Sequence, residues 1–214
     1  YKYRKFLIII LNFMIGIIDT ETGNINSVFN ILKRMKIKSI ITKKMDELLE
    51  CDKIILPGVG RFDACMRNLQ KYELDKIIKH LIIEKEKKIL CICVGMQLLL
   101  NYSEEGDSEG LKIINGHCTK FLISQVNNIP HIGWSPIKSK NRFLNYDGHE
   151  KSRFYFCHSY YPSIKEINID LITTNFNIEF CAGFIKKNII GVQFHPEKSL
   201  QNGANFLKNF VEKF

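Results

Sequence analysis

The sequence lacks the features that divide a chain into separate parts. Its 214 residues include only 5 prolines, and no internal repeat, low-complexity segment or Pro/Ser-rich linker interrupts them. Hydrophobic residues make up 45% and charged residues 25%, which is enough material for one sizeable core. We therefore expect one ordinary globular domain and exclude a repeat array or a disordered chain.

Disulfide and zinc patterns are also missing. The seven cysteines form no CxxC pair and no regular framework. The nearest candidate for a metal pair is Cys91-x-Cys93, but no second pair at ligand spacing accompanies it. We expect reduced thiols in a cytoplasmic protein, with neither a metal nor another cofactor.

The apolar run near the N-terminus is too short to span a bilayer. The basic segment Tyr1–Lys5 precedes the apolar run Phe6–Ile10, as in a signal peptide, but no small-residue cleavage site follows. Met14 then opens a regular strand pattern. We expect residues 1–13 to be an upstream extension and residues 14–214 to form the domain.

A basic cluster with interleaved aromatic residues, typical of nucleic-acid binding, is absent despite the net charge of +9. The lysines are scattered among many isoleucines and asparagines along the whole chain. A solvated basic surface therefore explains the charge better than a nucleic-acid partner does.

An abrupt change from strand to helix is present around Cys93. Lys88–Ile92 is a short apolar run of strand type, and Val94–Leu100 has helical spacing, with no loop residues to spare between them. A side chain on such a turn is pushed out over the end of a sheet, where the positive end of the helix dipole favours a thiolate. Cys93 is therefore the candidate nucleophile.

Short apolar strands alternate with helical patterns through the first half of the chain. Strands are expected at 14–19, 38–42, 53–56 and 89–92, and helices at 27–35, 45–50, 62–70 and 74–86. The alternation predicts an α/β fold with a flavodoxin-like, mixed but mostly parallel sheet that has helices on both faces.

After residue 106 the pattern changes to successive strands without long helices between them. They are expected at 117–123, 133–138, 153–160, 171–174, 179–185 and 189–194, before a final amphipathic helix at 203–213. We therefore expect an added antiparallel section in the C-terminal half.

A thiol nucleophile needs a base, a group that orients the base, and donors for the oxyanion. His195 and Glu197 follow a predicted strand, and the proline between them fixes the backbone. Such a pair keeps the ring in the tautomer that accepts a thiol proton, although a His–Glu pair alone is more often a surface feature. The backbone N–H of Val94 and the turn Pro57–Gly60 are candidate oxyanion donors.

Other histidines have open interpretations. His158 and His131 lie in apolar surroundings, where a structural histidine of the core is an equal alternative to a binding role. The remaining three are assigned no function: His80, His117 and His149.

Seven segments together resemble the class I, triad-type glutamine amidotransferases, and within them the glutaminase subunits of imidazole glycerol-phosphate synthase. The elbow and the His-Pro-Glu segment are specific to the superfamily, and the Pro-His-Ile-Gly-Trp and His-Ser-Tyr-Tyr segments narrow the match. The matching segments are Thr22–Asn24, Leu56–Gly60, Cys91–Leu99, Ser103–Gly106, Pro130–Trp134, Phe154–Tyr161 and Gly191–Ser199.

The resemblance assigns a role to each matching position. It implies a catalytic triad of Cys93, His195 and Glu197. It implies an oxyanion hole, whose glycine-rich strand needs a peptide flip in this family, at Gly58, Val59, Gly60 and Val94. It implies that glutamine lies against Gln97, Glu105, His158 and Ser159. It places the synthase interface and the ammonia exit at Asn24, Trp134, Tyr155 and Lys198.

The implied activity is hydrolysis of glutamine to glutamate and ammonia. The family passes ammonia to a (β/α)8 cyclase subunit in a heterodimer, which makes imidazole glycerol phosphate in histidine biosynthesis. A similar glutaminase that supplies a sugar-amidinating enzyme of surface-glycan biosynthesis is one alternative, since Ile178–Phe180 and Lys198–Gly203 are compatible with that branch. A partner-free cysteine hydrolase or chaperone of the same fold group is another. The intact Cys, His and Glu set disfavours a non-catalytic subunit.

One position departs from the family pattern. The family has glycine two residues before the nucleophile, whereas this chain has Cys91. Cysteine is small, so we expect the elbow to form with a tighter fit and with a second thiol beside the nucleophile. The spacing to Gly95 and Gln97 favours Cys93 over Cys91 as the nucleophile.

Overall fold

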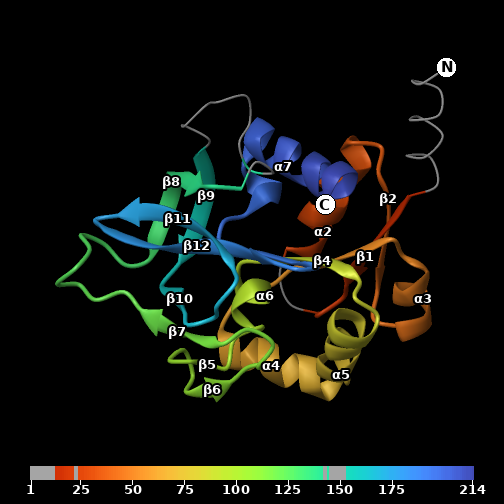
Figure 1. Cartoon of the computed structure of the whole chain (residues 1–214), viewed down its shortest axis with the longest axis horizontal. Coiled ribbons are helices and arrows are strands. Elements are labelled where there is room, and N and C mark those ends of the chain that lie inside the picture. The colour runs from red at the N-terminus through yellow and green to blue at the C-terminus, as the bar shows by residue number, and fades with distance from the viewer. Residues whose placement is uncertain (1–12, 22–23, 142–143, 145–152) are drawn as a thin grey trace.

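The computed structural model describes residues 13–21, 24–141, 144 and 153–214 (Figure 1). The expected upstream extension, residues 1–13, thus lies outside the described residues except for its last position. No helix in the described part of the chain is long and apolar enough to cross a membrane.

The first half of the chain alternates strands with helices, as expected. Its elements are β1 (Met14–Ile18), α2 (Ile25–Arg34), β2 (Lys38–Thr42), α3 (Met45–Glu50), β3 (Lys53–Leu56), α4 (Phe62–Lys71), α5 (Leu74–Lys79), η1 (His80–Glu84), β4 (Lys88–Ile92) and α6 (Val94–Gln97). The expected helix over 74–86 is divided, because α5 continues into the wider turns of the π-helix η1.

The second half consists mainly of strands. They are β5 (Tyr102–Ser103), β6 (Ser108–Glu109), β7 (Gly116–Lys120), β8 (His131–Ser139), β9 (Arg153–His158), β10 (Tyr160–Ile164), β11 (Asp170–Phe176), β12 (Ile178–Lys186) and β13 (Ile189–Val192). The 3-10 turn η2 (Pro196–Lys198) and helix α7 (Leu200–Lys213) complete the chain.

The described strands form two sheets. The nine-stranded sheet has the order β2-β1-β3-β4-β13-β12-β11-β8-β9, and the four-stranded sheet has the order β10-β7-β5-β6. In the larger sheet, neighbours pair in parallel from β2 to β13 and antiparallel from β13 to β9. The expected α/β fold with an added antiparallel section is confirmed.

One expected strand, 153–160, is two strands in different sheets. β9 pairs with β8 in the large sheet, whereas β10 pairs with β7 in the small sheet, so the chain changes sheets at Ser159. The small sheet also contains the short pair β5 and β6, which the sequence pattern does not predict. This change of sheet places the turn after β9 beside the ends of β4 and β13.

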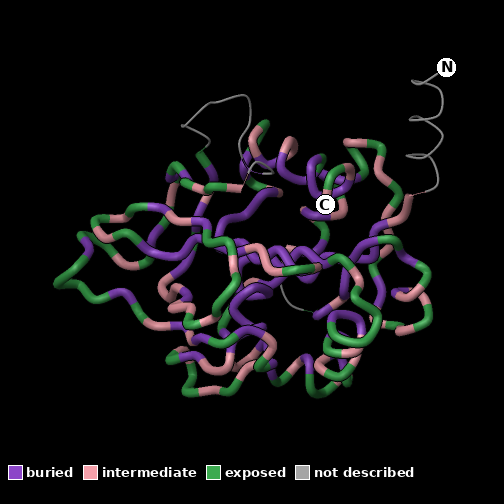
Figure 2. Tube along the Cα trace, viewed as in Figure 1, coloured by how far each residue is buried: buried purple, intermediate pink, exposed green. Residues whose placement is uncertain are grey.

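Helices cover both faces of the large sheet. α2 and α7 lie on one face, and α4 and α5 lie on the other (Figure 1). The buried residues are concentrated in the central strands between these layers (Figure 2). Strand β4 is buried from Ile89 onward, as expected for a strand covered on both faces. The parallel strands β3, β4 and β13 end at the same edge, and this edge carries the candidate site.

Candidate active site

Cys93 occupies the turn between β4 and α6 with no intervening residue. Its backbone has φ of 54° and ψ of −114°, and a positive φ is uncommon for a residue other than glycine. Its N–H donates to the Val192 carbonyl at 2.7 Å, so β13 fixes the turn. The helix that follows has only four residues, shorter than expected, so the helix dipole at Cys93 is weaker than the sequence pattern suggests.

Two glycines allow the neighbouring turn to pack directly on α6. A Cβ atom at Gly95 would lie 2.3 Å from the Leu56 carbonyl oxygen, and one at Gly58 would lie 2.3 Å from the Gly95 nitrogen. Any side chain at either position would therefore collide with backbone. These contacts explain why glycine is needed at position 58 of the first segment and at position 95 of the second.

Cys91 fits in β4 without disturbing its register. It lies opposite Leu56 of β3 and Gly191 of β13, and it is fully buried. Burial raises the pKa of the Cys91 thiol well above its usual range. Cys91 therefore stays a neutral thiol in the strand, and of the two cysteines Cys93 is the one that lines the cavity beside the elbow.

His195 and Glu197 lie just beyond the end of β13. His195 Nδ1 is 2.8 Å from Glu197 Oε1, which leaves Nε2 for its hydrogen bond with Cys93. Burial opposes protonation of the ring, but the charges and hydrogen bonds of Cys93 and Glu197 outweigh it and raise the pKa of His195 to about 10. His195 is therefore protonated at neutral pH and lies beside Cys93 as an imidazolium.

Backbone contacts fix the position of His195. Its N–H donates to the Tyr155 carbonyl at 2.8 Å, and its own carbonyl accepts from Ser199 Oγ at 2.6 Å. Ser199 Oγ in turn accepts from the Tyr155 N–H at 3.0 Å. Ser199 was not predicted as a site residue, and only its place in the segment Gly191–Ser199 indicated it.

Glu197 is held by a second donor as well. Asn24 Nδ2 donates to Glu197 Oε1 at 3.0 Å, while the Asn24 Oδ1 atom accepts from Ser27 Oγ. Among the described residues, nothing hydrogen-bonds to Glu197 Oε2, which is fully buried. Asn24, expected only at the partner interface or ammonia exit, therefore also contacts the carboxylate that orients His195.

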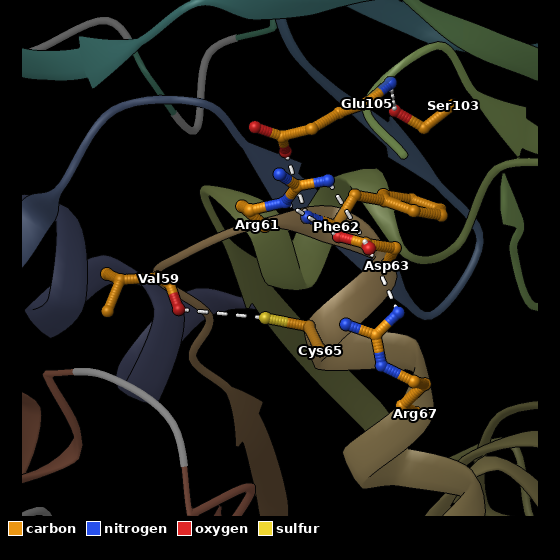
Figure 3. A network of polar contacts seen from close by, with 8 residues as sticks. All are labelled: Val59, Arg61, Phe62, Asp63, Cys65, Arg67, Ser103 and Glu105. Carbon is orange, nitrogen blue, oxygen red and sulfur yellow. Dashed lines mark hydrogen bonds and ion pairs between the residues drawn. The ribbon is translucent and has the colours of Figure 1, made fainter. Parts of the chain in front are cut away.

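The expected oxyanion donors are not all free in this structure. The Val94 N–H donates to the Gly58 carbonyl at 3.3 Å. In a trans peptide the N–H points opposite to the C=O, so the Val59 N–H faces away from Val94. The next carbonyl, of Val59, accepts from Cys65 Sγ at 3.6 Å (Figure 3). The Gly58–Val59 peptide thus turns its carbonyl, not its N–H, toward the elbow.

A cavity of about 520 Å³ opens beside Cys93. This volume is in the range of pockets that hold small molecules. Its walls come from both halves of the chain, and most of them were expected site residues. The lining residues are Asn24, Val59, Gly60, Cys93, Val94, Gln97, Glu105, Pro130, Cys157, His158, Ser159, Tyr160, His195 and Lys198.

Glu105 reaches this cavity from the loop between β5 and β6. Its Oε2 accepts from the Phe62 N–H at 2.9 Å, at the first residue of α4 (Figure 3). Arg61 lies beside Glu105 but pairs with Asp63, which also binds Arg67; these two arginines lower the pKa of Asp63 to about 2. Glu105 therefore presents a carboxylate that α4 positions and that no ion pair occupies among the described residues.

His158 and His131 form one buried hydrogen-bonded pair. His158 Nδ1 lies 2.8 Å from the Tyr160 carbonyl, which only accepts, so Nδ1 carries the proton. His158 Nε2 is then the acceptor for His131 Nδ1 at 3.0 Å, and His131 Nε2 accepts from Ser135 Oγ at 2.9 Å. Burial lowers the pKa of His158 to about 3 and that of His131 to about 4. Of the two, only His158 lines the cavity.

An outward aromatic face continues from the cavity along β8 and β9. Trp134 and Tyr155 are opposite each other in the two strands and their rings meet edge to face, with centroids 6.1 Å apart. Lys198 Nζ lies 5.9 Å from the Tyr155 ring centre and also lines the cavity. Trp134 is 38% exposed. These three expected interface residues therefore lie together at the rim, although Trp134 and Tyr155 are outside the cavity wall.

No group of three or more metal-ligating side chains is present in the described ranges. All seven cysteines are free thiols, and Cys157 is the exposed one. The cavity combines the cysteine and the histidine with two charged side chains, Glu105 and Lys198, and with neutral hydrogen-bonding groups.

Curated relatives match the chain over nearly its whole length. "Imidazole glycerol phosphate synthase subunit HisH 2" of Methanococcus maripaludis is 42% identical over 202 residues, 94% of this chain and 100% of the relative. "Imidazole glycerol phosphate synthase subunit HisH" of Leptospira interrogans is 39% identical, covering 92% and 99%. "Imidazole glycerol phosphate synthase subunit HisH 2" of Pseudomonas aeruginosa is 38% identical, covering 93% and 99%.

Solved structures share the fold. A glutamine amidotransferase crystal structure superimposes with a TM-score of 0.70 at 14% identity, covering 92% of this chain and 97% of the other. The structure of PurLQS from Thermotoga maritima gives a TM-score of 0.69 at 15% identity, covering 94% and 98%. The family "Glutamine amidotransferase class-I" matches residues 16–214. The chain belongs to the class I glutamine amidotransferase family.

Proposed function

We propose that this chain is the glutaminase subunit of an imidazole glycerol-phosphate synthase, acting in histidine biosynthesis. The observation that carries the proposal is the placement of Cys93 and His195 at the wall of a cavity large enough for glutamine, with Glu197 hydrogen-bonded to His195. Relatives named as subunits of this synthase, 38–42% identical over almost the full chain, support the choice of synthase.

The triad performs the reaction in two steps. Cys93 Sγ attacks the side-chain carbonyl carbon of glutamine, and the carbon–nitrogen bond breaks as His195 Nε2–H gives its proton to the departing nitrogen. Ammonia leaves and a glutamyl thioester remains. His195 then takes a proton from water, whose oxygen attacks the thioester, and glutamate leaves as the Cys93 thiolate re-forms. Glu197 keeps the proton on His195 Nδ1 throughout.

Oxyanion stabilisation requires the Gly58–Val59 peptide to turn over. In the described conformation, the Val94 N–H donates to the Gly58 carbonyl and is not available to the substrate. The second donor, the Val59 N–H, faces away from the elbow. After rotation, the N–H groups of Val59 and Val94 both point at the carbonyl oxygen of the substrate. The open space around Gly60, whose φ is 108°, gives the turn freedom to move.

Glutamine carries an ammonium and a carboxylate besides its reacting amide. The Glu105 carboxylate offers a counter-charge for the ammonium, and α4 holds it in place. Gln97, His158 and Ser159 line the same cavity and so lie within reach of the remaining atoms of glutamine. Both ring nitrogens of His158 are already hydrogen-bonded, so His158 shapes the wall of the cavity. We assign these four residues to glutamine binding.

Ammonia released into bulk water would be protonated, so the exit needs a second active site over it. We propose a (β/α)8 cyclase subunit as this partner, in a heterodimer, docked on the face of Trp134, Tyr155 and Lys198 with Asn24. Free thiols throughout support a reducing, cytoplasmic setting. Residues 14–214 would form the amidotransferase domain.

Glutaminase assays with and without the candidate cyclase subunit test the proposal. We expect glutamate release that the cyclase subunit accelerates, and we expect Cys93→Ala to lower it by about 10³-fold or more. Cys91→Ala is the matched control, because it removes the neighbouring thiol and leaves the cavity intact. Activity retained by Cys93→Ala would overturn the proposal.

Two other results would also overturn it. Stimulation by a sugar-amidinating enzyme instead of the cyclase would move the chain to surface-glycan biosynthesis. Rapid turnover of a substrate other than glutamine without any partner would make it an independent cysteine hydrolase.

A further inference from the structure

Gln193 lies beside Cys93 although the two are 100 positions apart in the chain. β13 and β4 are parallel neighbours with Val192 opposite Ile92. Gln193 follows β13 and Cys93 follows β4, so the two residues lie at the same edge of the sheet. Gln193 is fully buried, and its N–H donates to the Ala182 carbonyl at 2.8 Å. His195 lies two residues further along the chain, and the side chains of both Gln193 and His195 interact with Cys93 at the elbow.

The side-chain amide of Gln193 has a defined orientation. Gln97 Nε2 donates to the Tyr160 carbonyl at 3.0 Å, and this carbonyl accepts only, so that Gln97 atom is the nitrogen. The same nitrogen faces Gln193 at 2.9 Å, so the Gln193 atom there is the oxygen. The remaining atom, Gln193 Nε2, lies 3.5 Å from Cys93 Sγ and is a donor. The Tyr160 carbonyl thus fixes the orientation of the Gln97 amide, and through it that of the Gln193 amide, whose N–H points toward the sulfur.

We propose that Gln193 is a catalytic residue of this site, whose side-chain N–H donates to Cys93 Sγ and stabilises it as a thiolate. The proposal rests on the proposed function, since it adds a group to the same triad. No proton moves from Gln193 at any step. The sulfur instead receives two donors from different sides, Gln193 Nε2 and the protonated His195.

The two donors have different fates during the reaction. His195 gives up its proton when ammonia leaves, so the thioester sulfur then has only Gln193 as a donor. A hydrogen bond to a charged sulfur is stronger than one to a neutral sulfur. Gln193 therefore favours the states in which sulfur carries charge, the resting thiolate and the thiolate that leaves when water releases glutamate.

A purely structural role for Gln193 makes a different prediction. In that case, a buried amide would matter only through its contact with Gln97, and its loss would change stability but not the ionisation of the sulfur. Alkylation of Cys93 separates the two roles, because only the thiolate reacts. The titratable side chains around the sulfur include His195, with Glu197 behind it, and Cys118. Glu105, His158 and Lys198 line the same cavity, and the test changes none of these groups.

The experiment measures the rate at which iodoacetamide alkylates Cys93, from about pH 5 to about pH 10, in the full chain with its cyclase subunit. Mass spectrometry of the peptide containing Cys93 reports the site. Gln193→Met keeps the length of the side chain and removes the donor. Gln97→Met keeps Gln193 but removes the group that fixes its orientation. Gln201→Met, at an exposed position of α7, is the matched control.

We expect Gln193→Met to move the midpoint of the alkylation profile about one pH unit higher and to slow alkylation about tenfold at low pH. Its kcat should fall about tenfold with little change in KM. Gln97→Met should move the midpoint in the same direction by less, and Gln201→Met should not move it. If Gln193→Met fails to fold, the Gln97→Met profile decides.

Unchanged alkylation profiles in both variants would overturn the role of Gln193. That failure is distinct from failure of the proposed function, which shows as absence of glutaminase activity in the unsubstituted complex. A shifted profile without glutaminase activity would still support the contact between Gln193 and Cys93.

Discussion

His195 and the pair His131–His158 are equally buried around one active-site region, but their surroundings differ in charge. His195 lies between Cys93 and Glu197, and its pKa is raised to about 10. His131 stacks between Phe156 and Phe176, with centroids at 4.8 and 4.2 Å. Burial in that setting lowers the pKa of His131 to about 4 and that of His158 to about 3.

The difference shows which histidine can transfer protons. Burial opposes charge on all three rings, and only His195 has anionic partners that overcome it. The neutral pair has a directed set of hydrogen bonds from Ser135 to the Tyr160 carbonyl, which keeps both rings fixed. Residue type and depth therefore do not identify the base, whereas the charges around each ring do.

Removal of the charge beside His195 should have the largest effect. Glu197→Gln keeps the shape of the side chain but loses the anion, so the pKa of His195 falls and Nδ1 is no longer reserved for the proton. We expect kcat of the partner-loaded glutaminase to fall about 10³- to 10⁴-fold. Steady-state kinetics and NMR titration of the imidazole measure the two effects.

The matched control is Glu179→Gln. Glu179 lies at an exposed position of β12, where it pairs with Lys138 of β8. It should change neither the rate nor the titration of His195. If Glu197→Gln kept full activity, the carboxylate would not orient the base. The charges around His195 would then not explain why it, and not the neutral pair, transfers protons.

The neutral pair should make the fold sensitive to acid. In the unfolded chain each ring has a pKa near 6.5, while the folded values are about 4 and about 3. The unfolded state thus binds more protons below pH 6.5, and the free energy of unfolding falls as pH drops from there toward 4. We expect a loss of about 3 kcal/mol from each ring by pH 4, which is on the order of 6 kcal/mol from the pair.

Urea unfolding at several pH values measures this slope. In the double variant His131→Gln/His158→Gln, the free energy of unfolding should fall less between pH 6.5 and pH 4, whatever its value at neutral pH. Leu69→Ala, at a buried position of α4, removes no ring that titrates and should lower stability equally at all pH values. Equal slopes in the double variant and the parent chain would contradict the assignment.

The contribution of His195 to the free energy of unfolding has the opposite pH dependence, because its raised pKa gives stability that is lost only as pH rises toward 10.

Some of this contrast was accessible from the sequence. The elbow at Cys93 and the pair His195 and Glu197 are local patterns, and the strand 53–56 was predicted with its observed bounds. The α/β fold and the family were also identified correctly, because alternating strands and helices and short motifs are properties of neighbouring residues.

The remaining features depend on partners that are distant in the chain. The residues alone left the roles of His131 and His158 open, and only the resemblance assigned His158 to glutamine binding. Their pairing follows from the register of β8 and β9. Gln193 was missed because its contact with Cys93 needs β13 to lie beside β4. The orientation of the Gly58–Val59 peptide has no signature in residue types, since glycine permits either arrangement.

Asn24 offers a smaller change on the charged side of the comparison. Asn24→Ala removes one donor from Glu197 Oε1, so the carboxylate orients His195 less well. We expect kcat to fall about tenfold, since a hydrogen bond to a charged group is lost. Asn24→Asp places a second anion there and should raise the pKa of His195 further. NMR titration of His195 separates these effects from weaker cyclase binding, which is measured as Kd.

Ser27→Ala is the graded control, because it frees the Asn24 side chain without removing it. Its effect on kcat should be smaller than that of Asn24→Ala. If Asn24→Ala changed only the Kd for the cyclase, Asn24 would belong to the interface alone.

The smallest effect is expected from the neutral side. Ser135→Ala removes the donor to His131 Nε2, so that nitrogen loses its partner and becomes free to accept a proton. We expect a loss of about 1 kcal/mol in the free energy of unfolding at neutral pH, and a small rise in the pKa of His131. Glutaminase activity should stay within about twofold, because the His195 side of the cavity is untouched. Ser163→Ala, at a half-buried serine of β10, is the control for the loss of a hydroxyl. A large drop in kcat for Ser135→Ala would mean that the neutral pair takes part in proton transfer, because packing around His131 alone does not reach the reacting atoms.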